Sequence, residues 1–151
     1  MKIYPGLVRS TFLITSEDHS WRIWLWETQE DLKRWAERYA AGSREPGQYD
    51  DTDALHSPMD SLFIDGPKQH LGEIHFVKDQ WELEHVAHEM LHAMFHYIRV
   101  LVPDFSRALY RDLMGAEENL CYPFGEWVDW VYRWLWKFNP NPKWVKIPKE
   151  D

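Results

Sequence analysis

One long segment of the chain must fold as a helix that is buried on most of its surface. Between Asp79 and Val100, apolar side chains recur at helical spacing around nearly the whole circumference. Asp79 is placed to cap this helix, with Glu82 three residues later, and the helix has to stop before Pro103. A helix of this kind is buried, so the rest of the chain has to cover it. The apolar positions are Val86, Ala87, Met90, Leu91, Ala93, Met94, Phe95, Tyr97 and Ile98.

The polar residues of this helix form the string His88-Glu89-Met90-Leu91-His92. His88 and His92 lie one helical turn apart, so their imidazoles can reach one ion from the same side. Zinc accepts neutral imidazole nitrogen and prefers a tetrahedral shell. Glu89 lies about 100° further around the helix, beside such an ion, where it can take a proton from a metal-bound water. The string therefore predicts a zinc site with Glu89 as general base.

Other histidines lie near this pair. His85 and His96 extend it into a stripe, which leaves pairings such as His92 with His96 open. Only His88 and His92 enclose a glutamate in the right place. We expect His85 and His96 at the rim of the site, in its outer shell or in solvent. His75, on the preceding strand, is expected to be a satisfied strand histidine rather than a ligand.

A catalytic zinc usually has a third protein ligand and one position for water. Glu118 is the first candidate, because it shares a helical face with Cys121, Tyr122 and Gly125. Glu117 is the alternative, with Glu118 then in the outer shell, and a surface role for both glutamates stays open. Cys121 as a fourth ligand would instead indicate a structural zinc.

The remaining segments predict a small sheet and further helices, which together make an α+β fold. Alternating or β-rich runs predict strands at residues 7–15, 21–26, 61–65 and 71–77. In the last of these, Leu71 is expected to share a face with Glu73, His75 and Val77. Helices are predicted at about 29–40, capped by Thr28, and at 124–138. Residues 1–138 are expected to form one domain, and 139–151 an extended proline-rich tail.

Composition argues against several classes of partner. The net charge of −8 opposes binding to nucleic acid or to an anionic membrane surface. No stretch has the apolar length of a membrane span, and the N-terminus lacks the apolar run of a signal peptide. The single cysteine, Cys121, excludes an internal disulfide framework. A reducing, cytoplasmic location is therefore expected.

On these residues the chain resembles the zincin metallopeptidases, in the glutamate-ligand branch called gluzincins. It looks most like the compact HExxH domains of phage and mobile elements and the ImmA/IrrE-like peptidases. In those proteins the histidine motif is followed by a helix of the form Glu-x-x-small-x-x-Phe-small, which Glu118 to Gly125 match. Pro123 departs from this helix and predicts a kink or restart there.

The resemblance implies a zincin-like domain with a small, mostly antiparallel sheet packed on the HExxH helix. It implies His88, His92 and Glu118 as zinc ligands and Glu89 as base. It also implies that the strand before the metal helix is a sheet edge along which a peptide or protein substrate can lie. The expected function is zinc-dependent hydrolysis of peptide bonds.

A zinc-stabilised interaction module with little or no catalytic activity is the alternative function. The observation that supports this alternative is the tryptophan-rich last helix. Its side chains point in several directions at Trp127, Trp130, Trp134 and Trp136. An exposed aromatic patch there would mark the surface for a protein partner or a homodimer.

Overall fold

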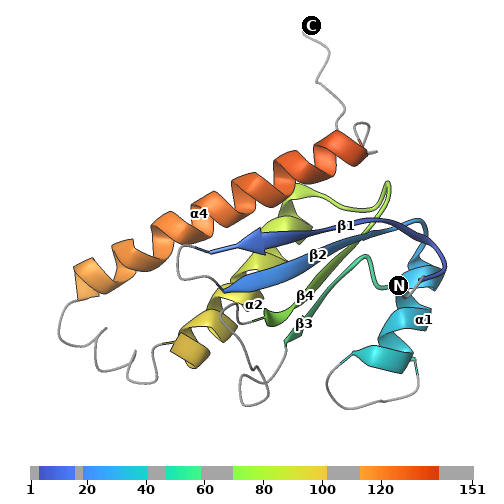
Figure 1. The fold of residues 1–151 in the computed structure, drawn as a ribbon, viewed down its shortest axis with the longest axis horizontal. Coiled ribbons are helices and arrows are strands. Elements are labelled where there is room, and N and C mark those ends of the chain that lie inside the picture. Colours follow the sequence, from blue (N-terminus) through green and yellow to red (C-terminus); the bar gives the residue numbers. More distant parts are fainter. Residues whose placement is uncertain (1–3, 16–18, 41–46, 59–69, 102–112, 140–151) are drawn as a thin grey trace, which may run out of the picture.

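The structure is a computed structural model, and it describes residues 4–15, 19–40, 47–58, 70–101 and 113–139. The predicted α+β class is confirmed (Figure 1). The strand predicted at residues 61–65 lies outside the described residues. In chain order the elements are β1 (Leu7–Ile14), β2 (Ser20–Trp26), α1 (Gln29–Tyr39), β3 (Ala54–Pro58), β4 (His70–Val77), α2 (Leu83–Leu101) and α4 (Leu113–Phe138).

The described strands form one mixed sheet in the order β1-β2-β4-β3. The pairs β1–β2 and β3–β4 are antiparallel, and the central pair β2–β4 is parallel. The strand before the metal helix, β4, is therefore internal, and the expectation that it forms a sheet edge is wrong. The edge beside α2 is β3, which pairs with β4 from Ala54↔Phe76 to Pro58↔Gly72. A short strand that ends in proline suits an edge, because proline cannot donate to a further ladder.

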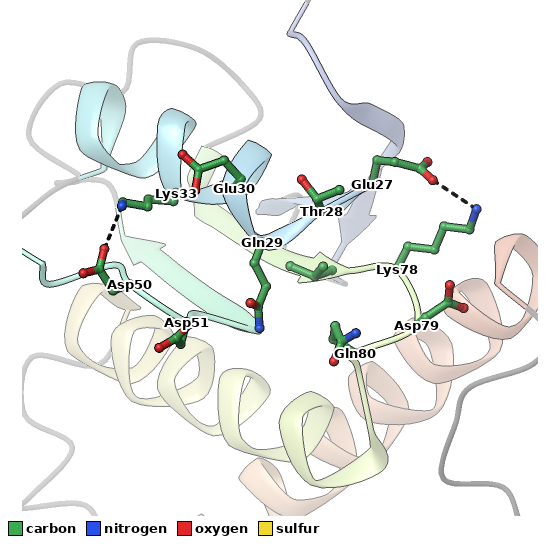
Figure 2. Close-up of a pocket in the computed structure, with 11 residues that line it drawn as sticks. Glu27, Thr28, Gln29, Glu30, Lys33, Asp50, Asp51, Lys78, Asp79 and Gln80 are labelled. Carbon is green, nitrogen blue, oxygen red and sulfur yellow. Dashed lines mark hydrogen bonds and ion pairs between the residues drawn. The ribbon is translucent and has the colours of Figure 1, made fainter.

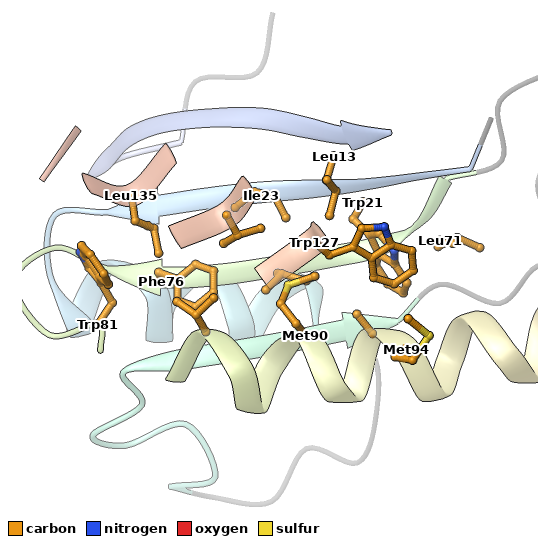
Figure 3. Packing of buried hydrophobic residues seen from close by; sticks show 14 of the residues in the cluster. Leu13, Trp21, Ile23, Leu71, Phe76, Trp81, Met90, Met94, Trp127 and Leu135 are labelled. Atoms are coloured by element: carbon orange, nitrogen blue, oxygen red, sulfur yellow. The ribbon is translucent and has the colours of Figure 1, made fainter. Parts of the chain in front are cut away.

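The two faces of the sheet carry separate cores, and β2 contributes to both by simple alternation. Trp21, Ile23 and Leu25 face α2 and α4 (Figure 3), whereas Trp24 and Trp26 face α1. Trp21, Trp24 and Trp26 are each at most 1% exposed. The helix that carries the histidines thus packs on one face of the sheet, together with α4.

The alternation of β4 is interrupted at its start. Leu71 joins Ile74 in the core under α2, so the prediction that it shares a face with His75 is wrong. The reason is an irregularity in the β2–β4 ladder, where Ser20 pairs with His70 but Trp21 pairs with Gly72. Gly72 has φ +144°, a conformation that residues with a side chain rarely adopt.

The structure confirms one of the predictions about where helices begin and contradicts two others. Thr28 caps α1 as predicted, and its hydroxyl accepts a hydrogen bond from the Asp31 N–H at 3.2 Å. Asp79 does not cap α2, which begins at Leu83, and Asp79 instead has φ +62°. The predicted restart at Pro123 is also wrong, because α4 runs through it as one helix from Leu113 to Phe138.

Asn139 connects the end of α4 to the turn before α2. Its Oδ1 accepts from the Asp79 N–H at 2.7 Å and from the Trp81 Nε1–H at 2.8 Å, and its Nδ2 donates to Asp79 Oδ1 at 2.8 Å. Asn139 is buried and belongs to the domain rather than to the predicted tail. Residues 140–151, the rest of that tail, lie outside the described residues.

Candidate metal centre

The two histidines of the HExxH string converge on the outer side of α2. His88 Nε2 and His92 Nε2 lie 3.2 Å apart, and both side chains are exposed. Tetrahedral zinc with bonds of 2.0–2.1 Å holds two ligand nitrogens about 3.3–3.4 Å apart. The spacing of the two nitrogens therefore fits a shared zinc ion.

Glu89 lies beside this pair but is buried, with 7% of its surface exposed. Burial raises the pKa of its carboxyl to about 7, against the opposing effect of a hydrogen bond from the backbone of His56 on β3. The carboxyl is thus held under the sheet edge instead of extending into solvent. The predicted role of Glu89 beside a zinc ion stays a prediction.

The carboxyl of Glu89 and the ring of His92 open into the same hollow. It has a volume of about 180 Å³ and is otherwise lined by Ala54, Leu55 and His56 of β3. At about 30 Å³ for each water molecule, the hollow can hold a few waters. A buried carboxyl and an imidazole therefore share a small space at the edge of the sheet.

His56 is the residue of this site that sequence reasoning missed. Its ring lies nearly parallel to that of His92, with 5.9 Å between centroids, and 6.2 Å from that of His96. The signal was weak, because Ala54–Pro58 is short and contains no β-branched residue. Only the pairing with β4 brings this segment next to α2.

The imidazole of His92 favours its neutral form. Partial burial, and to a lesser extent the neighbouring His88, lower its pKa. Neutral imidazole is the form that binds zinc.

The other histidines have different roles. His85 Nδ1 accepts from the Glu82 N–H at 3.1 Å, just before α2 begins. His96 is 8% exposed and meets Trp21 edge-on at 5.8 Å, so it does not lie in solvent. Its ring is 6.2 Å from that of His56, and its expected place in the outer shell of the site stays a prediction. His75 is fully buried on the opposite face of the sheet, away from the histidine pair, where its Nδ1 accepts from Trp26 and its Nε2 lies 3.6 Å from Glu73 Oε2.

The third ligand remains a prediction. Glu117 and Glu118 lie in the first turns of α4, and their side chains are outside the described part of the structure. Tyr97 of α2 packs on Trp127, and Glu118 precedes Trp127 by nine residues, which is about 13 Å of helix. In Figure 1 these first turns of α4 lie to the left of α2. In the described ranges, no set of three or more His, Cys, Asp or Glu side chains is arranged to hold a metal.

A larger hollow of about 620 Å³ lies away from the histidines, between the start of α1 and the turn after β4 (Figure 2). Its lysines are paired within the protein. Lys33 Nζ lies 2.8 Å from Asp50 Oδ1, and Lys78 Nζ lies 3.3 Å from Glu27 Oε1. It contains none of the predicted site residues.

Comparison with protein-family models, with curated proteins and with solved structures finds no match to this chain. Among the described helices, none is long and apolar enough to cross a membrane.

Proposed function

We propose that the chain is a zinc-dependent hydrolase, most simply a metallopeptidase. The observation that carries the proposal is the 3.2 Å separation of His88 Nε2 and His92 Nε2 beside the buried carboxyl of Glu89. His88 and His92 would hold the ion, with Glu118 or Glu117 as the carboxylate ligand. When bound, zinc supplies a Lewis acid for the substrate carbonyl and lowers the pKa of water.

The role of Glu89 in this proposal is proton transfer. Its carboxyl is held by burial and by the backbone of His56, and it lines the hollow that His92 also lines. From there it takes a proton from the attacking water and passes it to the leaving amine. The carboxyl needs no large movement, because the hollow brings water within its reach.

The edge strand β3 supports a peptide as substrate. The Asp53 carbonyl accepts from the Val77 N–H, whereas the His56 backbone bonds to Glu89. Backbone groups of even-numbered residues in β3 therefore turn away from β4, toward α2 and the outer edge. An extended peptide can add to such an edge by main-chain hydrogen bonds, other than to the His56 N–H, which Glu89 holds, and to Pro58, which has no N–H. This would bring the peptide beside the hollow.

The deciding experiment compares the wild type with Glu89→Gln. Glutamine preserves size but cannot accept the proton, so the variant should keep its fold and its zinc while cleavage falls by about 10²–10⁴-fold. An unbiased peptide library read by mass spectrometry supplies the substrates. Glu84→Gln, an exposed change on the same helix, is the matched control and should cleave normally. Equal cleavage by the wild type and Glu89→Gln would reject the proposal.

The second candidate is the zinc-stabilised interaction module. Trp130 supports it, because 38% of this large apolar side chain is exposed on α4. The other tryptophans of that helix support it less, since Trp127 is buried and Trp134 and Trp136 are half-buried. Tight zinc binding without cleavage of any library peptide would favour this function.

A further inference from the structure

The outer surface of α4 carries a strip of exposed and half-buried side chains around a shallow hollow. The hollow has a volume of about 430 Å³. Trp130 and Trp134 supply its apolar part, one helical turn apart. We call these six residues the α4 strip: Glu126, Asp129, Trp130, Arg133, Trp134 and Lys137.

Charge along the α4 strip is divided by sign. The acidic residues Glu126 and Asp129 lie toward the start of the helix, and the basic residues Arg133 and Lys137 toward its end. Asp129 and Arg133 pair within the helix at 2.9 Å, but their side chains are 61% and 78% exposed. A surface pair of this kind contributes little, so it can exchange for another arrangement at small cost.

We propose that the α4 strip binds the α4 strip of a second copy of this chain, antiparallel, in a twofold-symmetric dimer. Glu126, Trp130, Arg133 and Lys137 follow steps of four, three and four, which is the seam of paired helices. A twofold axis between positions 131 and 132 sets Glu126 opposite Lys137 of the second copy. The same axis sets Trp130 opposite Arg133, an aromatic ring against a guanidinium.

The division of charge selects both the partner and its direction. In a parallel pair, like charges would face each other along the whole strip. In the antiparallel pair, each acidic half meets a basic half, so the surface is complementary to itself. The tryptophans supply most of the affinity, since exposed ion pairs contribute little, and the charges supply the direction. A strip of this size gives a weak dimer.

Sedimentation equilibrium of the full chain, at concentrations up to about 1 mM, tests whether the dimer forms. At that concentration, half of the chains are dimeric even if the dissociation constant is about 1 mM. The wild type should associate, and Lys137→Glu and Glu126→Lys should each weaken association at least about 10-fold. The double variant Glu126→Lys/Lys137→Glu restores complementarity and should associate again. Arg34→Glu on α1 changes the net charge by the same amount as Lys137→Glu and should have no effect.

A mixing experiment tests whether the charges of the α4 strip lie in the interface. An acidic variant, Arg133→Glu/Lys137→Glu, and a basic variant, Glu126→Lys/Asp129→Lys, should each remain monomeric alone and form a 1:1 complex when mixed. A monomeric wild type at about 1 mM would overturn the proposal. So would single charge reversals that leave the strength of association unchanged, because the antiparallel pairing would then be absent. Neither outcome depends on zinc, so the proposed hydrolase function is tested separately.

Discussion

The indole Nε1 of Trp26 donates a hydrogen bond to Nδ1 of His75 at 2.9 Å, inside the core under α1. Because Nδ1 is the acceptor, the proton of the neutral ring lies on Nε2, which is 3.6 Å from Glu73 Oε2. The ring is fully buried against Trp35, with 4.1 Å between centroids. This one contact joins β2 to β4 and also fixes the tautomer of His75.

Trp26→Phe should destabilise the protein more than Trp24→Phe. Both changes remove similar volume from the same core, but only the first leaves the buried His75 Nδ1 without a donor, at a cost of about 1–3 kcal/mol. Trp24 Nε1 is buried and has no hydrogen-bond partner among the described residues, so Trp24→Phe is the matched control. Urea unfolding measures both, and equal losses would show that the bond contributes nothing.

Stability should fall on acidification, beginning near pH 6.5. Burial lowers the pKa of His75 below its ordinary 6.5, against the opposing effect of Glu73. The unfolded chain therefore binds a proton first, and the stability that neutral His75 contributes is present above pH 6.5 and lost as the pH falls. The loss is at most about 1.4 kcal/mol per pH unit for one group.

Glu73 should extend this loss to lower pH. Burial raises the pKa of its carboxyl, but the imidazoles of His70 and His75, whose Nε2 atoms lie 3.8 and 3.6 Å from its oxygens, outweigh burial and lower the pKa to about 2. The stability that ionised Glu73 contributes is present above pH 4.5 and is lost as the pH falls toward 2. Urea unfolding from pH 7 to 3 measures the slope. His75→Gln retains an acceptor for Trp26 and should flatten the slope between pH 6.5 and 5, and an unchanged slope would contradict the role of His75.

Zinc affinity should identify the ligands. The purified protein should bind about one zinc per chain. His88→Ala and His92→Ala should each weaken binding by more than the roughly 10–100-fold that outer-shell changes cost. Glu118→Ala should cost more than Glu117→Ala in zinc titrations. His85→Ala is the control on the same helix. A larger loss of zinc affinity in Glu117→Ala than in Glu118→Ala would make Glu117 the ligand. If neither substitution changes the affinity, neither glutamate is a ligand.

Asn139→Ala should cost about 2–4 kcal/mol, although the residue follows the last helix. It removes three hydrogen bonds and leaves the buried Trp81 N–H without its acceptor. The exposed neighbour Lys137, changed to Ala, should be nearly neutral. Thermal or urea unfolding separates the two, and a neutral Asn139→Ala would mean that the link between α2 and α4 adds no stability.

Local signals predict most of the elements of this fold. Alternation or a β-rich composition predicts β1, β2 and β4, helical spacing predicts α1 and most of α2, and the side chain of Thr28 marks where α1 begins. These features depend on neighbours within one or two turns of chain. The position of Glu89 beside His88 and His92 could be predicted for the same reason, since one helix carries all three.

Contacts between distant segments account for what the sequence does not predict. β3 and His56 become part of the site only because β4 pairs with that segment. The start of α2 differs from the prediction because Asn139, 60 positions away, binds the Asp79 N–H. The third metal ligand also depends on a contact between distant segments, because α4 would have to bring it to the histidines of α2.

The parallel pairing of β2 with β4 has a consequence for the rate of folding. Trp26 and His75, which this ladder joins, are 49 positions apart, and closing a loop of that length is entropically costly before any contact offsets it. The segments β3, β4 and α2 are nearer one another in sequence, so their contacts can form first. The residues around the histidine pair then assemble early, and closure of β2 on β4 limits the rate at which the whole domain forms.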